Sequence, residues 1–164
     1  CSRAKIKGVD TFVKTANNLP DIKFLVVGLA GDALERLQRI APSNVELMGP
    51  VSQDSLISLY QEAKVYCQLS IREGLPSALC EAMLCECIPV GTERNGLPKA
   101  IGDTGFYVPV GDPDATAKAV AKALQQPEKL GRRARERIME LFPVERREKG
   151  LAKAIDEVTE GGNI

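Results

Sequence analysis

Two carboxylates, Glu73 and Glu81, flank a short apolar segment in the middle of the chain. The segment opens with a Gly-Leu-Pro turn and continues into a helical pattern with few polar positions, which predicts a buried helix. Pro76 suits the first position of that helix, because its missing N–H is not needed there. The other N–H groups of the first turn can bind an anion. An ionised carboxylate in such a helix needs a partner, so Glu81 is a candidate binding residue.

The spacing of these groups fits a ligand with charge in its middle and hydroxyls at both ends. At ~1.5 Å of rise per residue, Glu81 lies roughly 6–8 Å beyond the anion site, and Glu73 lies on the loop side. Carboxylate oxygens accept hydrogen bonds from hydroxyl groups. A nucleoside diphosphate sugar has sugar hydroxyls, a diphosphate and ribose hydroxyls in this order. The alternative for Glu73 is a solvated charge or an ion-pair partner for Arg72. The alternative for Glu81 is a salt bridge within a structural network.

Residues 73–83, E-G-L-P-S-A-L-C-E-A-M, resemble the E-x7-E signature of the retaining nucleotide-sugar glycosyltransferases of family 4, which have the GT-B fold. The ordered series of further matches makes the resemblance specific. It covers nearly the whole chain, through I-P-V at 88–90, N-G-L-P at 95–98, D-T-G-F at 103–106 and V-P-V-G-D at 108–112.

The resemblance implies a role for each residue of this segment. Glu73 would hold the hydroxyls of the donor sugar, and Glu81 would hold the ribose hydroxyls. Ser77 would donate to a phosphate through its backbone N–H. The donor-binding residues implied by the resemblance are Arg3, Lys7, Glu73, Gly74, Leu75, Pro76, Ser77 and Glu81, with Glu73 and Lys7 as the catalytic residues.

The basic residues near the N-terminus would compensate the charge of the phosphates. In the family, a basic pair in the first loop, often Arg and then Lys-Gly, grips the diphosphate. Lys7-Gly8 matches this pattern, and Arg3 is the candidate arginine, although it stands closer to Lys7 than the family pattern places it. A plain surface arginine is the alternative for Arg3. Catalysis would then stabilise negative charge on the departing diphosphate without a divalent metal or cofactor.

Composition excludes several other classes of function. The 164 residues suffice for one domain with a substantial core. Twenty-two basic residues balance 22 acidic ones, which argues against a nucleic-acid binder. The chain has no histidine, which excludes imidazole metal sites and Ser-His or Cys-His catalysis. Its five cysteines, mostly in apolar segments, predict reduced thiols in a cytosolic protein.

Strand and helix signals alternate along the chain, which predicts an α/β fold: a Rossmann-like open parallel sheet with helices on both faces, one half of a GT-B enzyme. Ser52 and Asp112 are predicted to cap helices, and Pro113 to start one. Strands are expected at 22–27, 45–48, 65–69, 88–90 and 106–108. Helices are expected from 9 to 16, from 32 to about 40, from 53 to 63, from 76 to 85, from 113 to 124, and around 130–141 and 151–158. Residues 95–98 are expected to form a turn, followed by one helical turn through Ile101.

The first predicted loop begins almost at residue 1. We therefore expect residues 1–164 to form a single nucleotide-sugar donor-binding domain, the C-terminal half of a larger enzyme whose N-terminal acceptor domain is absent from this chain. By itself, the donor-binding domain of residues 1–164 would bind a UDP-, GDP- or ADP-sugar and would not transfer the sugar. The missing domain is then a partner, and a cytoplasmic location is expected. The arginines at 132–147 predict a solvated helix face, with a lipid or membrane-surface acceptor as a secondary expectation.

Two alternatives remain open from the sequence. The first is a non-catalytic interaction module that keeps the fold for subunit contact. The second is an enzyme like the related nucleotide-sugar epimerases, although the lack of histidine removes one source of the acid and base groups that such an enzyme needs.

Overall fold

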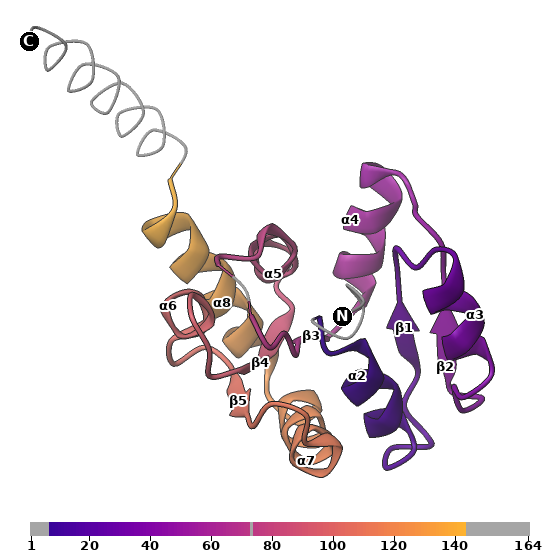
Figure 1. The fold of residues 1–164 in the computed structure, drawn as a ribbon. Helices are drawn as coiled ribbons and strands as arrows, with labels where there is room; N and C mark the ends of the chain where they lie inside the picture. The colour runs from indigo at the N-terminus through magenta and orange to yellow at the C-terminus, as the bar shows by residue number, and fades with distance from the viewer. Residues whose placement is uncertain (1–6, 73, 144–164) are drawn as a thin grey trace, which may run out of the picture.

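The computed structural model describes residues 7–72 and 74–143. Five parallel strands alternate with helices along the chain (Figure 1), as predicted. The strands are β1 (Phe24–Val26), β2 (Val45–Leu47), β3 (Val65–Gln68), β4 (Ile88–Thr92) and β5 (Phe106–Val108). The helices are α2 (Val9–Ala16), α3 (Asp32–Gln38), α4 (Gln53–Glu62), α5 (Ser77–Leu84), α6 (Leu97–Ile101), α7 (Pro113–Leu124) and α8 (Glu128–Leu141).

The strands form two parallel sheets. In the first, β1 pairs with β2, and Phe24 lies opposite Val45. In the second, β4 lies between β3 and β5, with Gln68 opposite Gly91 and Val90 opposite Phe106. Figure 1 shows the two sheets in separate parts of the molecule, and no ladder joins β1 to β3 within the described residues. The parallel α/β prediction is therefore confirmed, with two sheets in place of one.

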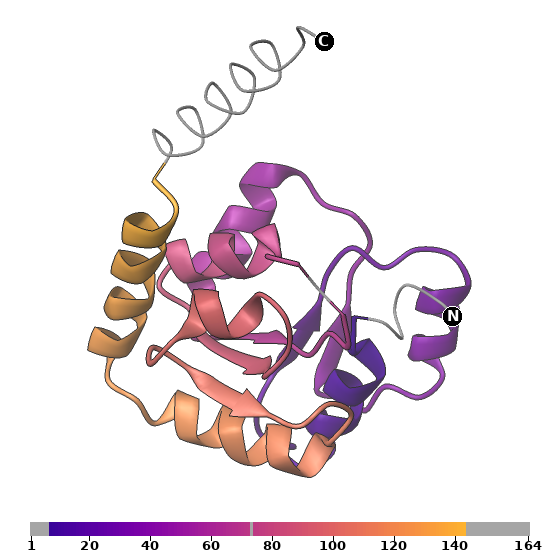
Figure 2. The ribbon, with the colours of Figure 1, turned by 60° about the vertical axis from the view of Figure 1, so that its left-hand side comes forward.

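Helices cover both faces of the three-stranded sheet, as predicted. Helix α7 packs on one face, where Val90 and Val108 meet Val120 and Ala123 in one buried cluster. Helices α5, α6 and α8 cover the other face, and Figure 2 shows α8 alongside them. There, Leu79 and Ile101 belong to a second buried cluster. Residues along a strand alternate between these two faces.

Two predicted caps fix the starts of their helices. The Asp112 carboxylate accepts a hydrogen bond of 2.8 Å from the backbone N–H of Ala115, and Pro113 begins α7. The Ser52 hydroxyl oxygen accepts from the N–H of Ser55 at the start of α4. Such a side chain satisfies one of the N–H groups that the first turn leaves without a helical partner.

The predicted element boundaries shift by one to two residues. Strand β1 is shorter than 22–27, and β4 is longer than 88–90 because Gly91 and Thr92 also pair with neighbouring strands. Helix α3 ends at Gln38, before the predicted Ile40. The helix expected around 151–158 lies outside the described residues.

Candidate functional site

Helix α5 begins at Ser77, and Pro76 is its N-cap. The predicted position of Pro76 inside the first turn is therefore wrong by one residue, because its backbone is extended, with ψ of 120°. Among the described residues, no side chain caps this end of the helix, and its first turn contains no acidic residue. No carboxylate in residues 7–72 and 74–143 thus neutralises the N–H groups at the start of α5, which suits an anion. Ser77 is exposed at this end.

Glu81 lies one turn further along α5, on the same face as Ser77. It is partly buried. Within residues 7–72 and 74–143, no side chain forms an ion pair with it. The Tyr60 phenol lies close enough to Glu81 to be affected by its charge. Burial of Tyr60, followed by the negative charge of Glu81, raises the pKa of Tyr60 to about 12. No lysine or arginine in the described part of the chain therefore forms an ion pair with the Glu81 carboxylate.

The prediction that α5 is buried on nearly every side is wrong. Leu79, Ala82 and Met83 are fully buried, but Leu84 is 38% exposed. The reason is geometrical: α5 contacts β3, β4, α4 and α8, and the face that carries Ser77 is open. An open face leaves the binding groups of α5 accessible to a ligand.

The first loop meets the carboxyl end of β3, next to the predicted donor loop. Gly8 has a left-handed backbone, with φ of 75°, and a Cβ at this position would lie 2.1 Å from the carbonyl oxygen of Leu69. Only glycine permits this contact without displacement. Lys7, which is exposed, is thereby placed near the start of the segment that leads to Glu73. Glu73 and Arg3 themselves lie outside the described residues.

Gly74 and Leu75 are exposed and lie against a second turn. A Cβ on Gly96 would lie 2.3 Å from the carbonyl oxygen of Gly74 and 3.3 Å from the backbone nitrogen of Leu75. Asn95, just before Gly96, has a positive φ of 50°, which shapes this turn. The predicted segment 95–98 thus supports the predicted donor loop directly.

A chain of polar side chains runs beneath this site, and sequence reasoning missed it. The Tyr66 hydroxyl donates to Gln68 Oε1 at 2.9 Å, and Gln68 Nε2 donates to Ser70 Oγ at 2.6 Å. Thr92 Oγ1 donates to the carbonyl oxygen of Ser70 at 2.7 Å. Gln68, Ser70 and Thr92 are buried. The available signal was the pair of polar residues Gln68 and Ser70, two apart, at the end of an apolar strand and just after it. These hydrogen bonds tie the end of β3 to β4 just before the donor loop.

The arginines of α8 make contacts within the domain, in addition to facing solvent. Arg133 forms an ion pair with Asp103 at 2.5 Å, and Arg135 lies 3.9 Å from Glu86. Arg137 donates to two backbone carbonyls of α6. The predicted solvated face is thus only part of their role. Arg146 and Arg147 lie outside the described residues.

The four cysteines in the described residues are free thiols: Cys67, Cys80, Cys85 and Cys87. Burial raises the pKa of Cys67 to about 12, and burial with the nearby Cys85 raises the pKa of Cys87 to about 12. The Cys87 thiol donates to the carbonyl oxygens of Tyr60 and Ala63. These thiols stay protonated at neutral pH, as expected of structural cysteines.

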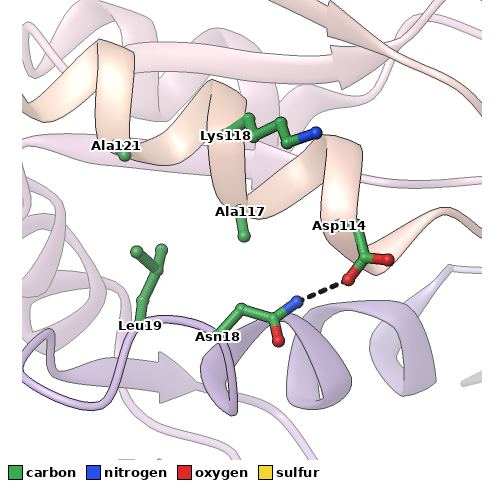
Figure 3. Close-up of a pocket in the computed structure, with 6 residues that line it drawn as sticks. All are labelled: Asn18, Leu19, Asp114, Ala117, Lys118 and Ala121. Carbon is green, nitrogen blue, oxygen red and sulfur yellow. Dashed lines mark hydrogen bonds between the residues drawn. The ribbon is translucent and has the colours of Figure 1, made fainter.

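A pocket outside the predicted site lies between the end of α2 and α7 (Figure 3). Asn18 Nδ2 donates to Asp114 Oδ1 at 2.7 Å across it. The pocket is lined by Asn18, Leu19, Asp114, Ala117, Lys118 and Ala121. None of these is a predicted donor-binding residue.

Within the described part of the chain, no group of three or more His, Cys, Asp or Glu side chains could hold a metal ion. Transfer without a metal stays a prediction. No helix in 7–72 or 74–143 is long and apolar enough to cross a membrane.

Comparison with known proteins identifies the family. The chain belongs to the family of glycosyl transferases group 1, whose model matches residues 1–126. N-acetyl-alpha-D-glucosaminyl L-malate synthase of Bacillus anthracis is 31% identical over 145 residues, which are 84% of this chain and 38% of that protein. Phosphatidyl-myo-inositol mannosyltransferase of Mycobacterium tuberculosis is 30% identical over 71% of this chain and 32% of its own length. The chain thus spans about a third of the length of these relatives.

Solved structures share the fold. Sucrose-phosphate synthase from Thermosynechococcus elongatus superimposes with a TM-score of 0.86 at 25% identity, over 96% of this chain and 44% of that one. A pneumococcal O-GlcNAc transferase, solved in complex with UDP and GlcNAc, gives a TM-score of 0.77 at 24% identity, over 95% of this chain and 34% of that one. The Rossmann-like α/β fold of GT-B glycosyltransferases is therefore confirmed.

Proposed function

We propose that this chain is the donor-binding part of a retaining, family 4 glycosyltransferase that uses a nucleoside diphosphate sugar. One observation carries the proposal: the uncapped start of α5 and the carboxylate of Glu81, which has no ion-pair partner in the described residues, share an open helix face. Glu81 accepts hydrogen bonds from the ribose hydroxyls, and the N–H groups near Ser77 bind the diphosphate. Glu73 and the backbone of Gly74 and Leu75 hold the sugar.

Lys7 supplies positive charge for the reaction. During transfer, the bond between the anomeric carbon and the diphosphate oxygen breaks, a bond from the anomeric carbon to the acceptor oxygen forms, and the proton of the acceptor hydroxyl passes to the departing diphosphate. Negative charge grows on the departing diphosphate. Lys7, Arg3 and the start of α5 stabilise it, and such electrostatic stabilisation is usually the largest catalytic contribution. In this proposal Glu73 positions the sugar and does not act as a base.

The names of two relatives indicate the chemical range of the family. One name combines a glucosaminyl group with L-malate, and the other combines a mannosyl group with phosphatidyl-myo-inositol. A sugar donor and a hydroxyl-bearing acceptor, including a lipid, are compatible with this range. The acceptor would be bound by the part of the full-length enzyme that this chain does not span, so the chain alone should bind donor and transfer nothing.

Calorimetric titration with UDP, GDP, ADP and their sugars tests the proposal. We expect one nucleotide series to bind, and Glu81→Gln to weaken that binding about tenfold, equivalent to about 1.4 kcal/mol. Glu62→Gln is the matched control, because Glu62 is an exposed carboxylate at the end of the neighbouring α4 and should not change affinity. Absence of binding to every nucleotide and nucleotide sugar would refute the proposal. Equal affinity of both variants would remove Glu81 from the site.

A further inference from the structure

Helix α6 has only five residues, and its last turn is held by a side chain from α8. Arg137 Nε donates to the carbonyl oxygen of Ala100 at 2.8 Å, and Arg137 Nη2 donates to that of Lys99 at 2.9 Å. A helix this short is not stable without such support. The guanidinium also places positive charge at the carboxyl end of the helix, where it is favourable.

Gly102, the residue after α6, leaves room for the guanidinium of Arg137. Gly102 has a positive φ of 55°, and a Cβ there would lie 2.3 Å from Arg137 Cζ. The Tyr107 hydroxyl, from β5, donates to the carbonyl oxygen of Gly102 at 2.9 Å. The end of α6 is therefore fixed from both α8 and β5, and Arg137 occupies space that only a glycine leaves open.

The other end of α6 supports the donor loop. Gly96 immediately precedes the helix and abuts the carbonyl oxygen of Gly74 and the backbone nitrogen of Leu75. Between the two ends, Leu97, Ala100 and Ile101 are fully buried. Helix α6 thus forms a short, packed link between Arg137 and the loop that contains Gly74.

We propose that Arg137 is a positioning residue for the donor sugar, which acts through α6 and Gly96 on the backbone of Gly74 and Leu75. This inference rests on the proposed function, which assigns that backbone to the sugar. Both hydrogen bonds that Arg137 donates go to backbone carbonyls of α6, so its effect should pass through the part of the site that α6 supports. The diphosphate and ribose contacts belong to α5, which packs on β3, β4, α4 and α8 and accepts neither of these hydrogen bonds.

The sugar contacts at Gly74 and Leu75 and the nucleotide contacts on α5 are different parts of the site. A positioning role of Arg137 can therefore be distinguished from a general structural role. Loss of overall stability would weaken binding of a nucleoside diphosphate and of its sugar conjugate alike. Loss of the support for Gly74 would weaken binding of the sugar conjugate and leave the free nucleotide unaffected. A comparison of the two ligands on the same variant therefore identifies the mechanism.

The test uses Arg137→Lys in the 164-residue chain, because a lysine cannot donate to both carbonyls in the geometry of the guanidinium. Dissociation constants for UDP, GDP or ADP and for the corresponding sugar are measured by calorimetry, with the nucleotide that the unsubstituted chain binds. We expect the nucleotide sugar to bind about fivefold more weakly, which is typical of a residue that acts without touching the ligand. The nucleotide should change by less than about twofold.

Two further variants complete the test. Arg135→Lys is the matched control, because it alters an arginine of the same helix that pairs with Glu86 and not with α6, and it should change neither constant. Tyr107→Phe removes the hydroxyl bond to Gly102 and keeps the ring, and it should give a smaller loss with the same selectivity for the sugar. It serves as the test variant if Arg137→Lys does not fold.

Each result has a defined meaning. Selective weakening of nucleotide-sugar binding supports the inference. Unchanged binding of both ligands, or equal weakening of both, overturns it while the proposed function stands. If the unsubstituted chain binds neither ligand, the proposed function fails, and the role of Arg137 in donor binding fails with it.

Discussion

Gly8 rests directly against Leu69, at a separation that leaves no room for a side chain between α2 and the end of β3. The contact joins two segments that lie about sixty residues apart in the sequence. It places the loop of Lys7 beside the strand that leads to Glu73. The first loop and the donor loop are thus parts of one surface because of a backbone contact, independent of any ligand.

Gly8→Ala should destabilise the chain through both strain and collision. The left-handed backbone alone costs an alanine about 1–2 kcal/mol, and the overlap with Leu69 adds to this cost. We expect a total loss of about 3 kcal/mol in the free energy of unfolding, measured by urea denaturation.

Gly111→Ala provides the control for this prediction. Gly111 also has a positive φ, of 76°, but a Cβ there would meet no atom within 4 Å. Its substitution should cost only the conformational part, about 1 kcal/mol. Equal losses for the two variants would show that the contact with Leu69 has no energetic consequence.

Thr92→Val should destabilise the chain without changing its packing volume. The substitution removes the hydroxyl that donates to Ser70, and both residues are fully buried. The carbonyl oxygen of the buried Ser70 then loses this donor, which costs about 1–2 kcal/mol. Urea denaturation measures the loss, and nucleotide-sugar titration measures its effect on the donor loop.

Thr11→Val is the comparison for Thr92. Thr11 lies on α2 and is partly exposed, so its substitution should change the free energy of unfolding by less than about 0.5 kcal/mol. A loss at Thr92 no larger than that at Thr11 would contradict a structural role for the polar chain beneath the site.

Stability should fall with rising pH above pH 10, in part because of Tyr60. Burial raises the pKa of its phenol from an ordinary value of 10.0 to about 12 in the folded chain. The folded chain therefore keeps a proton that the unfolded chain releases between these two values. The associated stabilisation is complete below pH 10 and is lost as the pH rises through about 12.

Comparison with Tyr60→Phe isolates this contribution. The thiols of the partly buried Cys67 and the buried Cys87 also have raised pKa values, and their ionisation at high pH lowers the stability in the same direction. Unfolding by urea at pH 9 and at pH 11, under reducing conditions, should therefore show a smaller pH dependence for the variant. Tyrosinate absorbance that develops fully near pH 10 in the folded chain would show that Tyr60 is not shielded by burial.

Much of the fold could be predicted because its signals are local. Asp112 and Pro113 define the start of α7, and β5 has the predicted bounds. The start of α5 was misplaced by one residue, since proline is compatible with both the N-cap and the first helical position. The extension of β4 over Gly91 and Thr92 was not predicted, because Gly91 does not favour a strand by itself and its pairing with Gln68 of β3 decides it.

In the candidate site, too, the features with a local sequence signal could be predicted, and those that depend on tertiary contacts could not. Ser77 and Glu81 share a helix face in the structure as the spacing predicts, because four residues make one turn. The roles of Arg3 and Glu73 stay predictions. The support of Gly74 by Gly96, and of α6 by Arg137, joins residues whose separation along the chain carries no local signal. Only tertiary structure shows these contacts.

In the described residues, no ladder of backbone hydrogen bonds joins β1 to β3, and this affects how readily the domain opens locally. Side-chain packing, chiefly between α2 and α7, joins the two sheets there. Regions held without backbone ladders are the ones that open locally at low free energy. Amide protons of α2 should therefore exchange with solvent faster than those of β4, and a ligand that bridges Lys7 and Ser77 should slow that exchange.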